Sequence, residues 1–596
     1  MDIMKPIPST ELPLGDEWIY EVKYDGFRCL VEWEKNGDIR LISRNHKDLT
    51  GSFPEVKERF LSAKGSVEDL LPLKLDGELV IHNTPFQTNF ARLQQRGRLK
   101  NLPGIRAAAA ERPATIRIFD ILEMRGSNLQ KTPLSERKQF LEEVLSRLGI
   151  EGVEADRNPD RIWKKLAKHR GEGLVAKRLG STYQDGKSHR DWYKIKNWRS
   201  IQGFLTSYQP ENGYYTVGVF DQEDIHIIGK CKHGLDTDAS QTLREIFTSR
   251  GEKQGGAFVL PPAICASIHT LDLYKGELRE PEFAALMPNM PPKDCTIEQL
   301  QLDMAMLPET VEPTNTSKLF WPDKGYTKGD LLTYIREMAP YMLPFLDDRA
   351  LTVIRCPDGV ESEHFFQKHL PAYAPDFVTG IPAGDEQLMV CDSLDSLVWF
   401  ANHGAVEYHI PFQLIQKDTP LEIVFDLDPP DRGKFHLAIK AALLIKPLLN
   451  DLGLASFVKT SGNKGLQIHI PIPEDTVTYQ ETAVFTQAIA WTVENAHPDL
   501  FTTERMKNKR NGRLYIDYIQ HGRDKTLIAP YSPRMTKDGT VAAPLFWKEV
   551  KEGLDPGNFT LENTAKRVRE LGCPFQDYRT AGETQKMDRM LELIKS

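Results

Sequence analysis

The chain has 596 residues and a formal net charge of −8, which excludes a single compact domain and a chain that is basic throughout. Its hydrophobic and charged fractions, 40% and 27%, exclude a disordered, collagenous or low-complexity protein. The seven cysteines are scattered and never in CxxC spacing, which argues against a disulfide framework or a zinc ribbon and fits a reducing cytosol. The amino terminus has no apolar run, and the most apolar later stretch, from Leu437, is interrupted by lysines, so we expect neither export nor membrane insertion.

Four segments are expected along the chain. Over residues 1–200, β-type runs such as LKLDGELVIH alternate with helical stretches such as LSERKQFLEEVLSRLG, which predicts a mixed α/β domain. Residues 201–288 hold short strands separated by turn residues, the pattern of a small β-barrel. Residues 289–315 contain four prolines, with a fifth directly before them at 288, and no sustained period, which is typical of a linker. Residues 316–596 again mix strands with amphipathic helices, and no repeat of 20 to 50 residues is apparent.

The first group of reactive residues lies in EVKYDGFR, with Lys23, Asp25, Gly26 and Arg28. A lysine amine attacks phosphorus only when deprotonated, and neighbouring cations with partial burial lower its pKa. Taken alone, the motif reads equally well as a surface lysine before a turn.

Further motifs follow in order: SRNHKDLT with Arg44, LDGELVIH with Glu78, RIFDIL with Phe119, GEGLVAKR with Glu172, and DWYKIK with Lys194 and Lys196. The series resembles the covalent nucleotidyltransferases, the superfamily of ATP-dependent DNA ligases, RNA ligases and capping enzymes. The resemblance implies a nucleotidyltransferase (ATP-grasp-like ligase) domain in which Lys23 carries AMP as a phosphoramidate.

The same resemblance gives the other residues their roles. Glu78 and Glu172 would hold the ribose hydroxyl and a magnesium ion, Phe119 would stack on adenine, and Lys194 and Lys196 would face the triphosphate and pyrophosphate. The remaining expected ATP-binding residues are Glu21, Arg28 and Arg44. The alternative readings are solvated strand-end acids, a core phenylalanine and an edge lysine that keeps its ammonium in water.

Positive charge is concentrated next to these motifs. Residues 161–200 hold 12 Lys and Arg against three acids, which suits a phosphate-rich polymer, although a solvated helix face remains open for Lys164 to Arg170. The following β module resembles the OB-fold domain of DNA ligases. Its usual closing motif is matched only loosely, by Arg279 and Lys293.

The second group of reactive residues lies in VFDLDPP, where Asp426 and Asp428 stand two apart on a β run and emerge on one face. Asp517, in the β run RLYIDYI, is the expected third carboxylate. Such a set is how two divalent metals are held for nucleotidyl transfer. An Asp-x-Asp turn before Pro429 is the alternative.

Three further motifs of this half follow in order: NHGAVEYH with His409, VKTSGNKGLQIHIP with Ser461 and Lys464, and IAPYSPR with Arg534. They resemble the primase-type polymerase domain of bacterial ligase D, the end-joining ligase, which implies an archaeo-eukaryotic-primase-like α+β fold. That resemblance implies triphosphate contacts for His409, Ser461, Lys464 and Arg534. It also implies a 5′-phosphate pocket with Lys318 and Lys328 and a template-stacking platform with Phe365 and Phe366. Gln467 stands where the family commonly has His, and His469 follows on the same strand face, so the role of either is open.

Resemblance to bacterial ligase D covers nearly the whole chain, in the order ligase then polymerase, without a phosphoesterase module. It implies an ATP-dependent DNA ligase and end-filling polymerase of non-homologous end joining. It further implies ATP with Mg²⁺ or Mn²⁺, DNA ends, nicks and gaps as substrates with NTPs or dNTPs, a preference for ribonucleotides, the Ku homodimer as partner, and a cytoplasmic, nucleoid-associated location. Two alternatives remain: an RNA ligase or capping-type enzyme, and a DNA-end scaffold with inactive centres.

Overall fold

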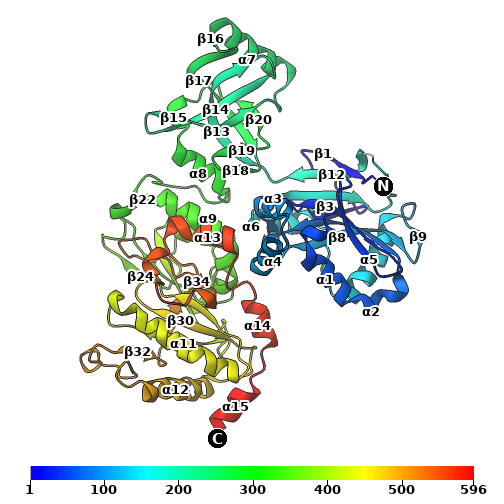
Figure 1. Ribbon diagram of the computed structural model, residues 1–596. Helices are drawn as coiled ribbons and strands as arrows, with labels where there is room; N and C mark the ends of the chain where they lie inside the picture. The colour runs from blue at the N-terminus through cyan, green and yellow to red at the C-terminus, as the bar shows by residue number, and fades with distance from the viewer. Residues whose placement is uncertain (1, 187, 596) are drawn as a thin grey trace. The chain divides into compact units, whose positions relative to one another are not determined.

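The computed structural model describes residues 2–186 and 188–595, which form two compact units (Figure 1). The first unit runs to Met306. The second consists mainly of the residues from Leu307 to Val568 and from Gly572 onward. Each unit has its own hydrophobic cores, so each is described by itself.

The first unit opens with two five-stranded sheets. One has the order β1 (Lys5–Pro8), β12 (Ser188–Lys196), β11 (Gly173–Arg178), β2 (Trp18–Val22), β10 (Ala155–Asp156). The other has the order β4 (Ile39–Ser43), β3 (Phe27–Trp33), β5 (Leu73–Val80), β8 (Thr115–Met124), β9 (Ser127–Asn128). The helices are α1 (Pro54–Ser62), α2 (Lys64–Val67), α3 (Phe90–Arg98), α4 (Leu102–Glu111), α5 (Leu134–Leu148) and α6 (Pro159–Lys168). The predicted mixed α/β class is confirmed.

The stretch from Trp18 to Trp33 forms two strands, β2 and β3, which are separated at Lys23–Gly26. Gly26 is the reason the chain can turn there, because a Cβ at this position would lie 2.3 Å from the carbonyl oxygen of Leu79. The turn leaves Lys23 at the end of one sheet and Arg28 at the start of the other.

A β-rich module completes the first unit and confirms the predicted small barrel-like domain (Figure 1). Its sheet has the order β15 (Asp224–Cys231), β14 (Tyr214–Asp221), β13 (Arg199–Gln209), β17 (Ala257–Thr270), β16 (Glu252–Gln254), with β20 (Glu282–Leu286) also paired to β17. Strands β18 (Asp272–Tyr274) and β19 (Glu277–Arg279) form a hairpin, and α7 (Thr237–Arg250) packs on β17.

Part of the segment expected as a linker is a helix, α8 (Ile297–Ala305). The five prolines lie on either side of it, at 288, 291, 292, 308 and 313, and so flank the helix instead of interrupting it. Thr296 caps its first turn, and Leu300 and Met304 are buried against β13 and β14. The helix therefore belongs to the core of the β-rich module.

The second unit contains two larger sheets. One has the order β31 (Phe501–Thr502), β32 (Leu514–Asp517), β28 (Glu422–Asp428), β30 (Leu466–Pro471), β29 (Phe457–Thr460), β34 (Pro544–Leu545). The other has the order β24 (Phe365–Gln367), β23 (Thr352–Arg355), β27 (Ala405–Pro411), β33 (Thr526–Ile528). The helices are α9 (Lys328–Leu346), α10 (Leu394–Asn402), α11 (Phe435–Asp451), α12 (Tyr479–Ala496), α13 (Leu561–Leu571), α14 (Tyr578–Thr584) and α15 (Asp588–Lys595).

The alternation of β28 decides which residues reach the second site. Ile423, Phe425 and Leu427 are fully buried on the face covered by α11 and α12, where Phe425 meets the ring of Phe485. Asp426 and Asp428 therefore project from the opposite face, because neighbouring residues of a strand point to opposite sides.

All seven cysteines are free thiols, as their spacing predicted. Among the helices in the described part of the chain, none is long and apolar enough to cross a membrane.

Candidate active sites

Lys23 and Glu172 meet at the ends of two adjacent antiparallel strands. Lys23 follows β2 and Glu172 precedes β11, and the two strands pair with Leu174 opposite Val22. The Lys23 ammonium donates to Glu172 Oε1, and the Lys23 amide donates to the carbonyl oxygen of Gly173 at 2.8 Å. The structure thus brings together two residues that lie 149 positions apart in the sequence.

Carboxylates surround the Lys23 amine. Burial alone would lower the pKa of Lys23, but Glu172, and more weakly Asp25 and Glu78, raise it above its ordinary value. The expectation that neighbouring cations lower this pKa is wrong for this arrangement, because the nearest charges are negative. Burial in turn raises the pKa of Glu78 to about 8, against the opposing charges of Arg28 and Lys23.

We expect Glu172→Gln to lower the pKa of Lys23 by about one pH unit or more, because it removes the charge that most stabilises the ammonium. The test is the pH at which Lys23 becomes half-modified by an amine-directed acylating reagent, read by peptide mass spectrometry. Glu142→Gln, an exposed change on α5, is the control. An unchanged or higher pKa in Glu172→Gln would contradict the assignment.

Two further lysines, Lys194 and Lys196, lie near Lys23. Lys194 and Lys196 stand on β12 on either side of the buried Ile195. Burial, together with Lys23 and Lys196, lowers the pKa of Lys194, which indicates that the three amines lie close together. Lys196 is 2.9 Å from a carboxylate oxygen of Glu280.

Arg279 of the β-rich module reaches the EVKYDGFR motif. Its guanidinium makes two hydrogen bonds to Asp25, one of them 2.8 Å long. Lys293, the other residue of the loosely matched closing motif, is exposed in a 3₁₀ turn. Of the two, only Arg279 is therefore placed beside the Lys23 site.

Phe119 lies between charged side chains. Its ring is 7% exposed, and its centroid is 4.3 Å from the Arg28 guanidinium carbon and 4.1 Å from Lys177 Nζ. Arg28 is also held by two 2.6 Å hydrogen bonds to Asp76. Arg44, by contrast, is exposed after β4.

Glu21 is buried beside this ring and pairs with Lys177, at 2.6 Å, and with Lys138. Burial lowers the pKa of Lys177 to about 8, against the charge of Glu21. Sequence reasoning gave neither lysine a role. The position of Lys177 in GEGLVAKR was the only available signal.

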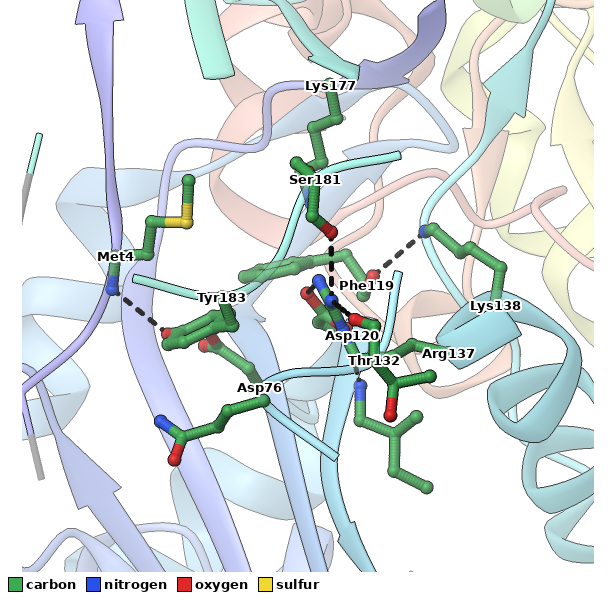
Figure 2. Close-up of polar contacts among 12 residues, drawn as sticks. Met4, Asp76, Phe119, Asp120, Thr132, Arg137, Lys138, Lys177, Ser181 and Tyr183 are labelled. Carbon is green, nitrogen blue, oxygen red and sulfur yellow. Dashed lines mark hydrogen bonds and ion pairs between the residues drawn. The ribbon is translucent and has the colours of Figure 1, made fainter. Parts of the chain in front are cut away.

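A buried polar network lies next to Phe119 (Figure 2). The Met4 amide donates to the Tyr183 hydroxyl at 3.1 Å, and this hydroxyl donates to Asp76 at 2.7 Å. Figure 2 draws these residues as sticks. Arg137 makes two 2.8 Å bonds to Asp120, and its guanidinium also donates to the carbonyl oxygen of Thr132. Since Phe119 precedes Asp120 on β8, this ion pair fixes the strand that carries the ring.

We expect Arg137→Met to destabilise the first unit by about 3–5 kcal/mol, because it leaves Asp120 charged and unpaired in a site from which water is excluded. The exposed pair of Arg125 and Asp69 gives the control, Arg125→Met, with an effect of about 0.5 kcal/mol or less. The measurement is urea unfolding of the full chain, in which the transition of the second unit should not move. Equal effects of the two substitutions would refute the importance of the buried pair.

The basic cluster of residues 161–200 is only partly on the surface. Lys164 and Lys165 are exposed on α6 while Ile162 and Leu166 are buried, as on a solvated amphipathic helix. Lys177 is buried, and Lys187 lies outside the described residues.

The second site is built on three strands. Asp426 of β28 is the register partner of Asp517 on β32 and of Gln467 on β30. Burial, and then the charges of Asp428 and Asp517, raise the pKa of Asp426 to about 7. Three carboxylates therefore repel one another across a short distance, which a cation between them would relieve.

In the structure, the carboxylates of Asp426, Asp428 and Asp517 are not arranged around a single point. Asp428 faces two cations, Lys464 at 2.9 Å and Arg510 at 3.4 Å, and Asp517 accepts from the hydroxyl of Tyr515 at 3.1 Å. Within the described residues, no three acidic, His or Cys side chains are grouped closely enough to hold a metal ion. The donor chemistry fits a hard divalent cation, provided that Asp428 exchanges its two cationic partners for it.

Of the residues expected at the triphosphate, Lys464 pairs with Asp428, whereas His409 and Arg534 are grouped at another carboxylate, Glu407. His409 and Arg534 both contact Glu407, at 2.9 and 3.1 Å. Glu407 was missed, although its position two residues before His409 on β27 puts both on one strand face. Ser461 accepts from the amide of Gly465 at 3.0 Å in the turn that carries Lys464.

Gln467 and His469 lie on the same face of β30 but contact different residues. Gln467 faces the Asp426 side, whereas His469 lies 2.7 Å from Glu422. Glu422 also accepts from Tyr578 and pairs with Arg349 at 2.8 Å. His469 thus belongs to a buried network of its own.

The lysines expected at the 5′-phosphate lie close together. The amide of Lys328 donates to the carbonyl oxygen of Lys318, and burial, with the charge of Lys318, lowers the pKa of Lys328 to about 8. Lys318 pairs with Asp358 and also donates to the carbonyl oxygen of Pro357. Phe365 and Phe366 on β24 are 42% and 71% exposed, so they are surface rings and not core.

Comparisons with known proteins agree with this division of the chain. A family model described as "ATP dependent DNA ligase domain" matches residues 4–196, and one described as "LigD, primase-polymerase domain" matches residues 327–575. The "Bifunctional non-homologous end joining protein LigD" of Bacillus subtilis is 38% identical over 99% of this chain and 99% of that protein. The "Multifunctional non-homologous end joining protein LigD" of Pseudomonas aeruginosa is 26% identical over 97% of this chain and 72% of that protein. The structure of the polymerase domain of Mycobacterium tuberculosis Ligase D in complex with DNA is 30% identical, covers 45% of this chain and 96% of that one, and has a TM-score of 0.42.

Proposed function

This chain belongs to the bacterial LigD family of non-homologous end-joining proteins, and from that premise we propose that it repairs DNA ends with two active sites. The first unit seals strands as an ATP-dependent DNA ligase, and the second adds nucleotides as a polymerase. The observation that carries the proposal is that one chain holds a buried lysine–carboxylate pair, Lys23 with Glu172, in its first unit and three aspartates on two paired strands, β28 and β32, in its second.

At the first site, the deprotonated Lys23 amine attacks the α-phosphorus of ATP, so an N–P bond forms while the P–O bond to pyrophosphate breaks. AMP then passes from Lys23 to a DNA 5′-phosphate, and a 3′-hydroxyl displaces it to seal the strand. The ion pair with Glu172 stabilises the ammonium form of Lys23 and so keeps this residue unreactive. The pair must therefore separate, and Lys23 must lose its proton, before the amine can attack ATP.

The neighbouring residues position ATP for that attack. Lys194 and Lys196 would neutralise the triphosphate and the departing pyrophosphate. For this, Lys196 would leave its ion pair with Glu280 and bind a phosphate oxygen instead. The remaining expected ATP-binding residues are Glu21, Arg28, Arg44 and Phe119. Mg²⁺ or Mn²⁺ at Glu78 and Glu172 would supply further charge neutralisation.

At the second site, Asp426, Asp428 and Asp517 would hold divalent cations that lower the pKa of a primer 3′-hydroxyl and stabilise the triphosphate. The expected triphosphate contacts are His409, Ser461, Lys464 and Arg534. Lys318 and Lys328 supply positive charge for a 5′-phosphate, and the exposed rings of Phe365 and Phe366 offer a stacking surface for a template base.

Family membership also supports the finer parts of the proposal. These are ATP as adenylate donor, DNA ends, nicks and gaps as substrates, NTPs used in preference to dNTPs, the Ku homodimer as partner at DNA ends, and action at the nucleoid.

The proposal is tested with three labelled substrates: a nicked DNA duplex, a nicked RNA duplex, and a gapped DNA duplex with NTPs or dNTPs. We expect the purified chain with ATP and Mn²⁺ to seal the DNA nick and to fill the gap. Sealing of RNA alone would point to an RNA ligase. Before the assay, pyrophosphate is used to remove any AMP already bound to the protein. Failure on all three substrates would then favour a DNA-end scaffold with inactive centres.

A further inference from the structure

One fully buried lysine beside the carboxylates of the second unit has no part in the function proposed above. Lys459, on β29, has none of its surface exposed, and its Nζ donates to Oε1 of Gln467 at 2.5 Å. A lysine is very rarely buried completely, because removing an ammonium from water is costly unless partners replace the water. The contact with Gln467 is therefore the first place to look for its purpose.

The sheet register places this lysine in one row with the carboxylates. Lys459 is the partner of Gln467, Gln467 is the partner of Asp426, and Asp426 is the partner of Asp517. Register partners on antiparallel strands have Cβ atoms about 4.5–5.5 Å apart, so each member of the row contacts the next. The row runs across four adjacent strands, from β29 to β32.

The two hydrogen bonds of Gln467 have a fixed direction. Its amide oxygen accepts from Lys459, which leaves the amide NH₂ to donate, and the side chain of Gln467 hydrogen-bonds that of Asp426. Glutamine suits this position because one planar group both accepts from an ammonium and donates to a carboxylate. Without Lys459, the amide could rotate and present its oxygen to Asp426 instead.

We propose that Lys459 is a positioning residue of the second site, which acts through Gln467 to hold the Asp426 carboxylate in the orientation that binds a divalent cation. Lys459 touches neither the cation nor the reacting atoms. The inference rests on the proposed function, since it takes Asp426 as a metal ligand, and it adds a residue outside the set expected to touch metal, nucleotide or DNA.

The test is the affinity of the full chain for Mn²⁺ alone, read from the electron paramagnetic resonance signal of the free ion. Glu78→Gln and Glu172→Gln are present throughout, so that the expected ion of the first unit does not contribute. We expect Lys459→Met to weaken Mn²⁺ binding about tenfold, as is usual when a partner that orients a metal ligand is removed. If Lys459 acted only through its charge, its loss would tighten binding, because a cation would no longer repel the ion. Unchanged or tighter binding would overturn the proposal.

Three variants keep the result interpretable. Lys459→Gln retains an NH donor for Gln467 and should restore most of the affinity. Lys446→Met removes a half-buried lysine of α11 that bonds Ser456, and should change nothing. Gln467→Met breaks the same row at its centre and should weaken binding as much as Lys459→Met, with no further loss in the double variant. If Lys459→Met does not fold, as judged by thermal unfolding, Gln467→Met and Lys459→Gln decide the question.

Asp426→Asn separates the two claims. If it binds Mn²⁺ as tightly as the native chain, Asp426 is not a ligand and the metal assignment of the proposed function fails. If it loses binding while Lys459→Met retains it, the metal assignment stands and only the role of Lys459 is refuted.

Discussion

Replacing Lys23 with alanine is expected to reduce the transfer of AMP from ATP to the protein by about 10³-fold or more, to the level of background labelling. The amine nitrogen is the atom that bonds to phosphorus, and alanine offers no substitute. Nucleotide addition by the second unit should be unchanged, because that unit has its own core and its own charged residues. Radiolabel from α-labelled ATP retained on the denatured protein gives the first result, and primer extension gives the second.

Lys177 is the rival nucleophile in the same unit. Its pKa is lowered to about 8, whereas that of Lys23 is raised, so the amine that is more easily deprotonated is not the one in the motif. Lys177 nevertheless lies over the ring of Phe119 and is paired with Glu21, which places it on the side expected for the adenine base. Peptide mapping of the adduct distinguishes them, and AMP found on Lys177 would overturn the assignment. Lys131→Ala, at an exposed position, is the control that should retain full labelling.

Regular patterns allowed much of the fold to be predicted. Helix α5 and strands β5 and β28 occupy the stretches whose sequence patterns indicated them. The prediction failed at α8, because a nine-residue helix between prolines has too few turns to show a period. The turn after Lys23 depends on a close approach of Gly26 to a strand some fifty residues away, which no local pattern records.

The sites were predictable where one strand or one motif carries the pattern, and not where distant segments meet. Asp426 and Asp428 share a strand face, so two-residue spacing was enough to pair them. The contact of Arg279 with Asp25 joins residues 254 positions apart, and no local pattern records it. The environment of Lys23 was predicted with the wrong sign for the same reason, because its dominant neighbour, Glu172, comes from another strand.

Asp426→Asn is expected to abolish nucleotide addition, by about 10³-fold or more, while the Lys23 adduct still forms on ATP. Asp426 is the middle carboxylate of the cluster, flanked by Asp517 across the sheet and by Asp428 along the strand. The asparagine keeps the shape and can still hydrogen-bond Gln467, so the loss would reflect the missing charge and not a collapsed strand. Primer extension on a gapped duplex, with Mn²⁺ varied over a wide range, is the measurement.

Asp418→Asn gives the matched control. Its carboxylate is 78% exposed and pairs with Arg523, so removing the same charge there should leave extension within about twofold of native. Native-like extension by Asp426→Asn would show that the cation is held elsewhere. Loss of both extension and the Lys23 adduct would instead mean that the two units do not work independently.

The two active sites lie in separate units, each with its own core. Lys23→Ala and Asp426→Asn should therefore complement each other when mixed on a gapped, nicked substrate, with one chain filling the gap and the other sealing it.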